Sequence, residues 1–183
     1  LHEEPWETAC DDVTGKLLSA KMVRAARKEE IEYFKKHQVY IKVPISRCLR
    51  VSGKMPIKVR WVDVNKGDSV NPDYRSRWVA KEINNCKRED LFAATPPLEA
   101  KKLLFILAVT EGYGWTKGST RQMKLDFIDV RRAYFYARAK RDVYIKLPKE
   151  DEQAGMCGKL DMSMYGTRDA AQNWDCLLYT SPS

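Results

Sequence analysis

The feature that most constrains the fold is an apolar segment, residues 123–130, that delivers one carboxylate to its end. Apolar and polar side chains alternate from Met123 to Phe127, and this period of two predicts a β-strand. The alternation stops at Asp129, whose carboxylate oxygens are of the kind that magnesium prefers. Asp129 is therefore the first candidate for a metal ligand. Asp126 is its competitor, and we interpret it as structural or solvated because it lies inside the alternating strand.

The chain is basic and long enough for about one domain. It has 183 residues, of which 44% are hydrophobic, so it can build a core. Lys and Arg outnumber Asp and Glu by 33 to 25, which gives a net charge of +8. This balance favours a polyanionic partner such as nucleic acid. An ordinary basic surface is the alternative that composition leaves open.

Cysteine and histidine usage argues against a zinc site. Five cysteines are scattered without a Cys-x-x-Cys pair, and there are only two histidines, too few for the usual ligand patterns. Such a set predicts free thiols in a reducing, intracellular compartment. No apolar run approaches the roughly 18 residues of a membrane span, so no membrane partner is expected. The chain begins at Leu1 without a methionine or signal-like region, and we interpret it as a fragment of a longer reading frame.

The first part of the chain predicts a helix, a strand and a hairpin. Residues 39–44 predict a strand ended by proline. Residues 57–64 and 74–81 alternate and are joined by a turn signal at residues 65–68, so they predict an antiparallel hairpin with basic residues between apolar ones. Before them, residues 21–36 have the apolar spacing of an amphipathic helix, at Met22, Val23, Ala26, Ile31 and Phe34.

A second helix is predicted over residues 98–110, after two prolines. Thr95 is its expected cap, and its expected buried stripe consists of Leu103, Leu104, Leu107 and Ala108. The elements expected later are a short helix or turn over 131–139, paired strands over 143–148 and 159–164, and a helix over 168–175.

Five blocks of sequence carry a family resemblance. Asp129-Val130-x-x-Ala133-Tyr134-Phe135 resembles the first palm motif of reverse transcriptases. Four neighbouring blocks narrow the resemblance to the reverse transcriptase of copia-type LTR retrotransposons. The order and spacing of the five blocks match those of the family, and the resemblance covers residues 22–175. These four blocks are Arg60-Trp61-Val62, the stretch from Tyr74 to Lys81, Val143-Tyr144-Ile145-x-x-Pro148, and the stretch from Tyr165 to Trp174.

The resemblance implies an α+β fold: the fingers and a partial palm of a right-hand polymerase, with antiparallel sheets and packed helices. Residues 176–183 do not resemble the family's continuation, and we interpret them as a non-native tail that looks like translated sequencing-adapter read-through. The implied parts are an N-terminal segment and helix at 1–38, fingers at 39–95, the first part of the palm at 96–139, a return to the fingers at 140–160 and the second part of the palm at 161–175.

The implied activity is template-directed DNA synthesis from deoxynucleoside triphosphates, on a primed RNA or DNA template. Magnesium is the implied cofactor, held by Asp129 and by the backbone carbonyl of Val130. Tyr134 occupies the family's gate position, where an aromatic ring would clash with a ribose 2′-hydroxyl and favour deoxynucleotides. A buried core tyrosine is the alternative for Tyr134, whereas Phe135 is expected in the core.

Several basic residues are candidates for phosphate contacts. By resemblance, the hairpin with Arg75, Arg77 and Lys81 folds over the incoming nucleotide, where guanidinium groups can fork onto phosphate oxygens. Which of the three does so stays open. Arg131 and Arg132 are more basic than the family's residues at these positions, and they contact either the triphosphate, the template phosphate or water. Charges that track a nucleic-acid backbone are expected at Arg138, Lys140 and Arg141.

The block from Tyr165 to Trp174 is implied to contact the template and primer. We assign this contact to Tyr165, Gly166, Arg168 and Trp174. Three positions depart from the family's pattern, because Thr167, Asp169 and Ala171 stand where the family has Leu, Gln and Pro. The change at Asp169 puts an acid where an amide is expected near nucleic acid.

The family's two further catalytic carboxylates, in an aromatic-x-Asp-Asp hairpin, do not occur in this sequence. One carboxylate holds two magnesium ions poorly, so we expect the isolated chain to be inactive. The implied partner is the rest of a Pol polyprotein, with protease, integrase and ribonuclease H elsewhere, in a cytoplasmic particle or the nucleus. One alternative is a non-catalytic nucleic-acid-binding remnant of a decayed element. The other is a basic structural protein, which explains the charge but not the ordered blocks.

Overall fold

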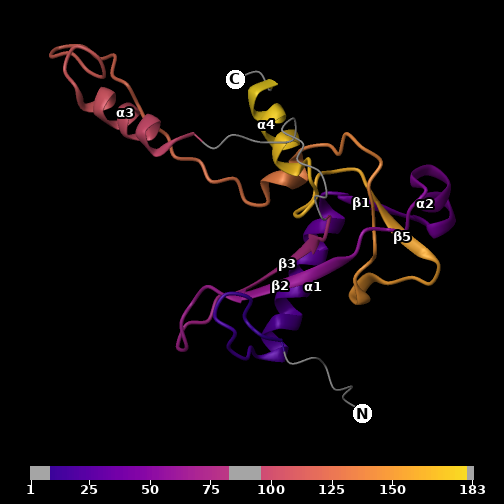
Figure 1. Cartoon of the computed structure of the whole chain (residues 1–183). Helices are drawn as coiled ribbons and strands as arrows, with labels where there is room; N and C mark the ends of the chain where they lie inside the picture. The colour runs from indigo at the N-terminus through magenta and orange to yellow at the C-terminus, as the bar shows by residue number, and fades with distance from the viewer. Residues whose placement is uncertain (1–8, 83–95, 181–183) are drawn as a thin grey trace. The chain divides into compact units, whose positions relative to one another are not determined.

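The computed structural model of the chain describes residues 9–82 and 96–180 (Figure 1). The chain divides into two compact units. Unit 1 consists of Leu1–Leu91 and Arg132–Ser183, and unit 2 consists of Phe92–Arg131. Unit 1 mixes helices with antiparallel sheet, so the predicted α+β class is confirmed. None of the helices in the described residues is long and apolar enough to cross a membrane.

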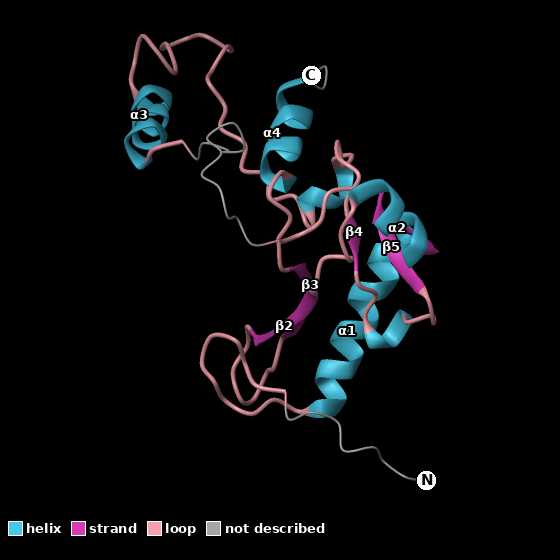
Figure 2. Ribbon diagram, turned by 45° about the vertical axis from the view of Figure 1, so that its right-hand side comes forward, coloured by secondary structure: helices cyan, strands magenta, loops and turns pink. Residues whose placement is uncertain are grey.

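Helix α1 (Ala20–Lys36) is the amphipathic helix that the sequence predicts. It packs along a β-hairpin, as both ribbon views show (Figures 1 and 2). Val23, Ile31 and Phe34 are buried on its inner face. Met22 was expected there too, but it is 38% exposed, because it lies in the first turn beside the buried stripe.

The hairpin consists of β2 (Val59–Asn65) and β3 (Tyr74–Ala80). The strands pair antiparallel from Val59 opposite Ala80 to Asn65 opposite Tyr74, which confirms the predicted hairpin. Successive side chains of a strand point to opposite faces. The face toward α1 carries Trp61, Asp63, Ser76, Trp78 and Ala80, and the outer face carries Arg60, Val62, Arg75, Arg77 and Val79.

The second sheet has three antiparallel strands in the order β1-β5-β4. They are β1 (Tyr40–Pro44), β5 (Met156–Leu160) and β4 (Tyr144–Ile145). The predicted strands near residues 40 and 144 are therefore confirmed, although β4 is short. The predicted partner strand over 159–164 was wrong in its bounds. Beyond β5 the backbone turns to other partners: Met162 N–H donates to Val39 at 3.1 Å, and Ser163 N–H donates to Ala137 at 2.7 Å.

Short helices complete unit 1. The 3-10 helix η2 (Ala133–Tyr136) lies where the sequence predicts a short helix or turn. Helix α4 (Ala170–Thr180) begins near the predicted position and continues past residue 175. A second 3-10 helix, η3 (Lys149–Asp151), follows β4. Helix α2 (Ile45–Ser52) was not predicted; it begins after a proline and ends at Gly53, whose φ of 66° closes the helix in the left-handed region.

Aromatic side chains form the centre of the core of unit 1. The Phe34 ring lies 5.0 Å from the Trp78 ring and 4.5 Å from the Phe135 ring, centroid to centroid. All three residues are at most 1% exposed, so Phe135 is in the core as predicted. The burial of each ring contributes about 1.5–3 kcal/mol to the stability of the fold. This contact joins α1, the hairpin and η2 into one packed body.

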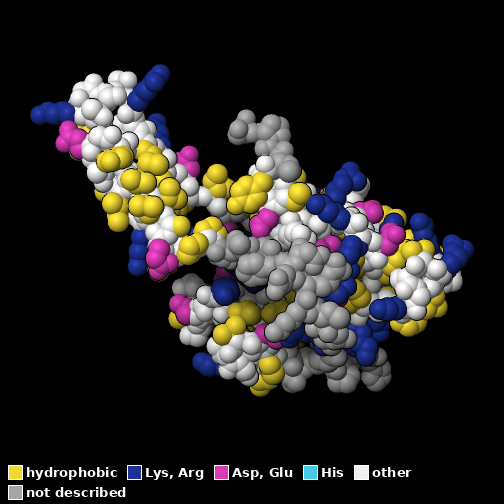
Figure 3. Space-filling model, turned by 45° about the horizontal axis from the view of Figure 1, so that its top comes forward, with side chains coloured by type: hydrophobic (Ala, Val, Ile, Leu, Met, Phe, Trp, Pro, Cys, Tyr) yellow, Lys and Arg dark blue, Asp and Glu magenta, His cyan; other side chains and the backbone are white. Residues whose placement is uncertain are grey.

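Unit 2 contains helix α3 (Leu98–Val109), as predicted, but the helix has no buried stripe. Leu103 and Leu104 are 54% and 48% exposed, and yellow apolar side chains gather over this unit in Figure 3. The predicted strand over 123–130 was also wrong, because this segment has no regular structure. A strand needs a neighbouring strand for its backbone groups, whereas in the described residues this segment pairs with no strand, and its Met123 N–H donates to the Gly114 carbonyl at 2.6 Å. The predicted cap, Thr95, lies outside the described residues.

Candidate functional site

The predicted site residues are divided between the two units. Asp129, Val130 and Arg131 end unit 2, whereas Tyr134 and all the others belong to unit 1. The Asp129 side chain is exposed and Val130 is half-buried. Asp126, the competing carboxylate, is exposed as well. Both carboxylates are thus open to solvent and to ligands.

The predicted magnesium ligands make only part of a metal site. A carboxylate and a backbone carbonyl are suitable oxygen ligands for magnesium, which fits Asp129 and Val130. However, nowhere in residues 9–82 and 96–180 do three or more Asp, Glu, His or Cys side chains form a group that could hold a metal ion. The described residues therefore do not complete a magnesium centre.

Three predicted site residues come together in unit 1: Arg77, Tyr134 and Tyr165. The Tyr134 and Tyr165 rings lie 5.4 Å apart in an edge-on arrangement, and the Arg77 guanidinium carbon lies 5.6 Å from the Tyr165 ring centre. Arg77 lies on the outer face of β3, Tyr134 in η2, and Tyr165 in the turn before α4. Burial raises the pKa of Tyr165 above its ordinary value, so its hydroxyl stays protonated at neutral pH. We call these three residues the aromatic–arginine cluster.

Tyr134 and its neighbour Phe135 have different environments. Phe135 is 1% exposed, whereas Tyr134 is half-buried and packs edge-on against Tyr165. A ring with one free side and one packed side can meet a ligand without losing its orientation. The geometry therefore leaves Tyr134 available for the gate role that its sequence position predicts.

Arg132 was predicted to contact phosphate or to face water, but in the structure its guanidinium faces helix α1. Arg132 Nε donates to Glu30 Oε2 at 2.8 Å, and the guanidinium carbon lies 3.5 Å from the centre of the Tyr33 ring. Glu30 is 1% exposed, and burial raises its pKa although Arg132 acts to lower it. Arg132 also has a left-handed backbone, with φ of 55°, which is uncommon for a residue other than glycine. Nothing in the local sequence marks Glu30 as its partner.

Gly166, predicted to contact the template, has a structural role against the hairpin. Ala80 N–H donates to the Tyr165 carbonyl at 2.8 Å, so the turn lies against the end of β3. Gly166 has φ of 79°, and a Cβ atom here would collide with the Ala80 carbonyl oxygen. Only glycine fits this close approach. The turn therefore fixes Tyr165 beside the outer face of the hairpin.

Arg168 and Asp169 belong to a charge network around Glu82. Arg168 donates to Glu82 through Nε at 3.0 Å and through its backbone N–H at 2.9 Å. Arg141 donates to Glu82 at 3.0 Å and to Asp169 at 2.6 Å. Burial, the largest single effect, acts to raise the pKa of Asp169, but the hydrogen bond and charge of Arg141, together with a hydrogen bond from Asn173, lower the pKa overall. The acid that departs from the family's pattern is thus neutralised inside the protein.

The other predicted contact residues lie at the surface or partly buried. Arg75 is exposed and pairs with Asp73 at 3.3 Å. Lys81 is exposed just after β3, and Trp174 is half-buried in α4. Arg75, Arg77 and Lys81 are separated by even numbers of positions, so their side chains face the same side of the hairpin. That side is the basic outer face.

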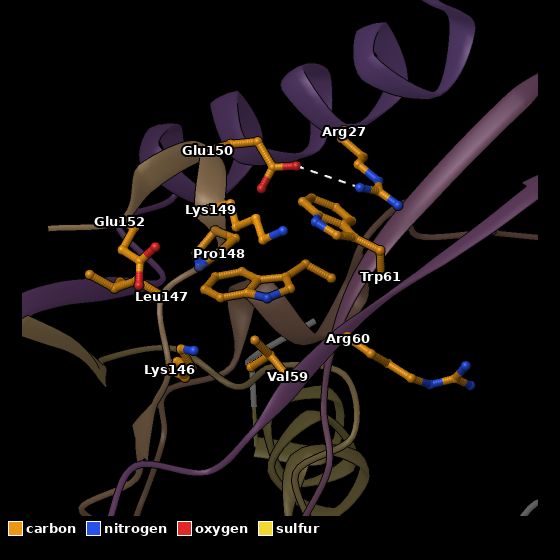
Figure 4. Close-up of a pocket in the computed structure, with 11 residues that line it drawn as sticks. Arg27, Val59, Arg60, Trp61, Lys146, Leu147, Pro148, Lys149, Glu150 and Glu152 are labelled. Carbon is orange, nitrogen blue, oxygen red and sulfur yellow. Dashed lines mark ion pairs between the residues drawn. The ribbon is translucent and has the colours of Figure 1, made fainter. Parts of the chain in front are cut away.

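A hollow of about 390 Å³ lies on the opposite side of the hairpin, toward α1 (Figure 4). Trp61 lines it, and the Arg27 guanidinium carbon lies 5.2 Å from the Trp61 ring. Arg27 pairs with Asp63 at 2.7 Å and with Glu150 at 3.7 Å, the latter drawn as a dashed line. The positive charge of Arg27 is therefore already neutralised. We call this the tryptophan hollow.

Cysteines contribute no cross-link to the described structure. Cys10, Cys48, Cys157 and Cys176 form no disulfide, and Cys86 lies outside the described residues. Burial raises the pKa of the Cys157 thiol to about 11, so this thiol is protonated and a poor nucleophile at neutral pH.

Comparison with known proteins connects the chain with a protein family. A family model described as reverse transcriptase (RNA-dependent DNA polymerase) matches residues 48–181. No curated protein and no solved structure matches the chain. The matched span includes the hairpin, Asp129, the aromatic–arginine cluster and the Glu82 network.

Proposed function

Because the chain belongs to the reverse transcriptase family, we propose that it forms the fingers and the first part of the palm of a copia-type retrotransposon polymerase. The proposed activity is the transfer of deoxynucleotides to a primer on an RNA or DNA template. The family match covers most of the chain. The five sequence blocks support the narrower copia-type assignment.

The observation that carries the proposal is the contact between Arg77, Tyr165 and Tyr134. It joins a cation of the basic hairpin to the aromatic residue at the family's gate position. A triphosphate on the outer face of the hairpin would meet Arg77, and guanidinium groups bind phosphate oxygens in pairs. Its sugar would then lie near Tyr134, where a ring excludes a 2′-hydroxyl by steric contact.

The remaining predicted contact residues fall into two groups: side chains that are available to a ligand, and side chains that already bind carboxylates of unit 1. Arg75 and Lys81 stay proposed phosphate contacts, because both side chains are exposed. Arg131 stays a candidate for the triphosphate or template phosphate. Arg132 and Arg168 are bound to carboxylates of the same unit, so we assign them the positioning of the turns on either side. Tyr165 and Trp174 remain the proposed template and primer contacts.

Magnesium is the proposed cofactor, with Asp129 and the Val130 carbonyl as its first ligands. When bound, the metal would neutralise charge at the reacting phosphate. Further carboxylates from a downstream part of the polymerase are needed to complete the site. We therefore propose that the chain acts within a larger Pol polyprotein, in a cytoplasmic particle or the nucleus, and that it is inactive by itself.

Primer extension tests the proposal on the polypeptide encoded by the complete reading frame at the source locus. We expect Asp129→Asn to lower the extension rate by more than about 100-fold, since even outer-shell partners of a metal cost 10–100-fold. Asp126→Asn is the matched control, because it makes the same change three residues earlier and should leave extension intact. An equal loss of extension in both variants would show that Asp129 was wrongly assigned as the metal-binding carboxylate.

The second candidate function is a non-catalytic nucleic-acid-binding remnant of a decayed element. The observation that favours it is the lack of a complete acidic metal site in the described residues. Under this alternative, the complete polypeptide binds a primed template at saturating magnesium but extends no primer. Extension that depends on Asp129 would exclude it.

A further inference from the structure

Two buried cysteines from distant parts of the sequence belong to one small cluster in unit 1. Cys48 in α2 is 1% exposed and Cys157 in β5 is 0% exposed. They pack with Val43 and Tyr144 in a buried group that is distinct from the aromatic core. We call this group the thiol cluster. Neither thiol has a part in the proposed polymerase function.

The fold brings the two cysteines together through the turn from β1 into α2. In the ladder between β1 and β5, Val43 stands opposite Cys157. The chain enters α2 two residues later at Ile45, whose N–H donates to the Gly155 carbonyl at 2.9 Å. This hydrogen bond ties the start of α2 to the residue just before β5. Because the buried residue of α2 is Cys48, the helix directs this thiol toward Cys157 in the thiol cluster.

The two thiols affect each other directly. Burial foremost, and then Cys48 through its charge and a hydrogen bond, raise the pKa of Cys157 to about 11. The Cys48 thiol also donates to the Lys54 carbonyl, with Sγ 3.2 Å from the oxygen. Packing in one cluster and this mutual influence make the two sulfur atoms neighbours.

Only one of the two thiols borders a hollow. Cys48 lines a hollow of about 610 Å³ at the base of the hairpin, together with Ser52, Met55 and Tyr144. Cys157 is not part of this lining. A small molecule that enters the hollow therefore meets the Cys48 sulfur first, and Cys157 is reached only from Cys48.

We propose that Cys48 and Cys157 are a redox-sensitive pair, which hydrogen peroxide converts into a disulfide between α2 and β5. Cys48, as the thiolate, attacks one peroxide oxygen; the O–O bond breaks, and the leaving hydroxide takes up a proton and becomes water. Cys48 is then a sulfenic acid, which condenses with a thiol. The Cys157 sulfur attacks the Cys48 sulfur, the S–O bond breaks, and the hydroxyl leaves with the Cys157 proton as a second water. The two thiols lose two electrons, and the peroxide gains them.

The position of Cys157 offsets its weak reactivity. A thiol with a raised pKa is a poor nucleophile in solution, but a reacting group that is held beside its target has a very high effective concentration. Without such a neighbour, a sulfenic acid is oxidised further to a sulfinic acid, which most proteins cannot reverse. The thiol cluster therefore favours the reversible product.

The disulfide would join the two chain segments that make up unit 1. Leu1–Leu91 contains Cys48, and Arg132–Ser183 contains Cys157, while unit 2 lies between them in the sequence. A cross-link that closes such a long loop restricts the unfolded chain and stabilises the folded one. The redox state of the pair would thus control how firmly α2 and the sheet of β1, β5 and β4 hold together.

Peroxide treatment tests the proposal on the variant C10S/C86S/C176S, which keeps only Cys48 and Cys157 of the five cysteines. We expect the number of thiols, counted after unfolding, to fall from two to zero, and the intact mass to fall by two hydrogen atoms. Dithiothreitol should restore both thiols. The urea midpoint of the oxidised protein should exceed that of the reduced protein. Peptide mapping of the oxidised natural chain, which needs no substitution, should identify the same linked pair.

Alanine at one cysteine of this variant provides the matched controls. With C157A, peroxide should add oxygen atoms to Cys48 and leave the urea midpoint without an increase. With C48A, the Cys157 thiol should survive the same treatment, because it borders no hollow. Cys157 oxidised as fast without Cys48 as with it would overturn the proposed order of attack.

Other products of the two-cysteine variant would overturn the proposal itself. A gain of oxygen without loss of hydrogen would mean that the two sulfur atoms do not meet. Disulfide-linked dimers would mean that the thiols react between molecules, and an unchanged thiol count would mean that neither is reactive.

Limited proteolysis gives a second measurement. Trypsin cleavage anywhere between residues 48 and 157 cuts the loop that the disulfide closes. On a denaturing gel without reductant, the pieces from oxidised protein should stay joined, and those from reduced protein should separate. Separation in both states refutes the cross-link. None of these measurements involves primer extension, so the redox proposal and the polymerase proposal can fail independently.

Discussion

Arg132 and Glu30 are joined by a hydrogen bond of 2.8 Å between Nε and Oε2, and this ion pair ties the start of η2 to helix α1. The Arg132 side chain is 12% exposed and the Glu30 side chain 2%. Arg132 stands two residues before Tyr134, in a left-handed backbone conformation. The pair therefore fixes the turn from which the proposed gate residue projects.

Removing one partner of this pair should destabilise unit 1 strongly. Arg132→Met leaves the Glu30 carboxylate buried without its counter-charge, which typically costs about 3–5 kcal/mol. The free energy of unfolding, measured by urea denaturation, should fall by this amount. The double variant Glu30→Leu/Arg132→Met removes both charges and should recover most of the loss, because apolar replacements of buried pairs are often neutral. A double variant less stable than Arg132→Met would contradict this account.

Glu30 should make stability fall as pH rises. Its pKa is above the ordinary value of 4.5 in the folded protein. Between 4.5 and the raised pKa, the folded state binds more protons than the unfolded state, so the unfolding free energy decreases with pH. Glu30→Gln removes this contribution. We expect the difference in stability between the two proteins to change with pH across that window and to be constant below it, by urea denaturation at several pH values.

Asp11 should have the opposite effect, at lower pH. Its carboxylate accepts backbone hydrogen bonds from Asn65 at 2.7 Å, Thr14 at 2.8 Å and Val13 at 2.9 Å. These bonds, that of Asn65 foremost, lower the pKa of Asp11 from 3.8 to about 2. Its contribution is complete above pH 3.8 and is lost as the pH falls toward 2. Asp11→Asn should remove this acid-sensitive component; identical acid unfolding curves for both proteins would disprove the assignment.

Gly166→Ala should cost more than the same change at another left-handed glycine. Gly155, with φ of 72°, has open space around its Cβ position, whereas Gly166 abuts the Ala80 carbonyl. Gly155→Ala should therefore lose only the backbone preference, about 1–2 kcal/mol. Gly166→Ala adds overpacking of about 1–3 kcal/mol. Urea denaturation of both variants gives the comparison, and equal costs would mean that the turn does not lie against β3 as described.

Local signals in the sequence predicted most of unit 1. The hairpin is predictable because the alternation and the turn at residues 65–68 lie within one short stretch. Helix α1 is predictable for the same reason, from its own spacing. By contrast, α2 has eight residues with a single buried one, Cys48, so its apolar pattern is too short to recognise.

Long-range relationships account for what the sequence could not predict. The Glu30 to Arg132 pair spans 102 positions, and no periodicity connects two such residues. The acid at Asp169 looked out of place because its partner Arg141 comes 28 positions earlier. The segment 123–130 alternates like a strand, but a strand also needs a neighbour to accept its hydrogen bonds. Of the site residues, the sequence predicted Arg77, Tyr134 and Tyr165 singly, and the fold supplies their contact.

The pairing of β1 with β5 has a consequence for how the chain folds during synthesis. Tyr40 pairs with Leu160, and Pro44 pairs with Met156, so β1 leaves the ribosome long before its partner strand exists. Pairings between distant positions close large loops and form slowly. A translation product that stops before residue 156 would keep β1 and β4 with unpaired edges, which are sites of aggregation. Ribosome pausing between residues 44 and 156 would therefore leave unpaired strand edges of the nascent chain exposed to aggregation and to chaperones.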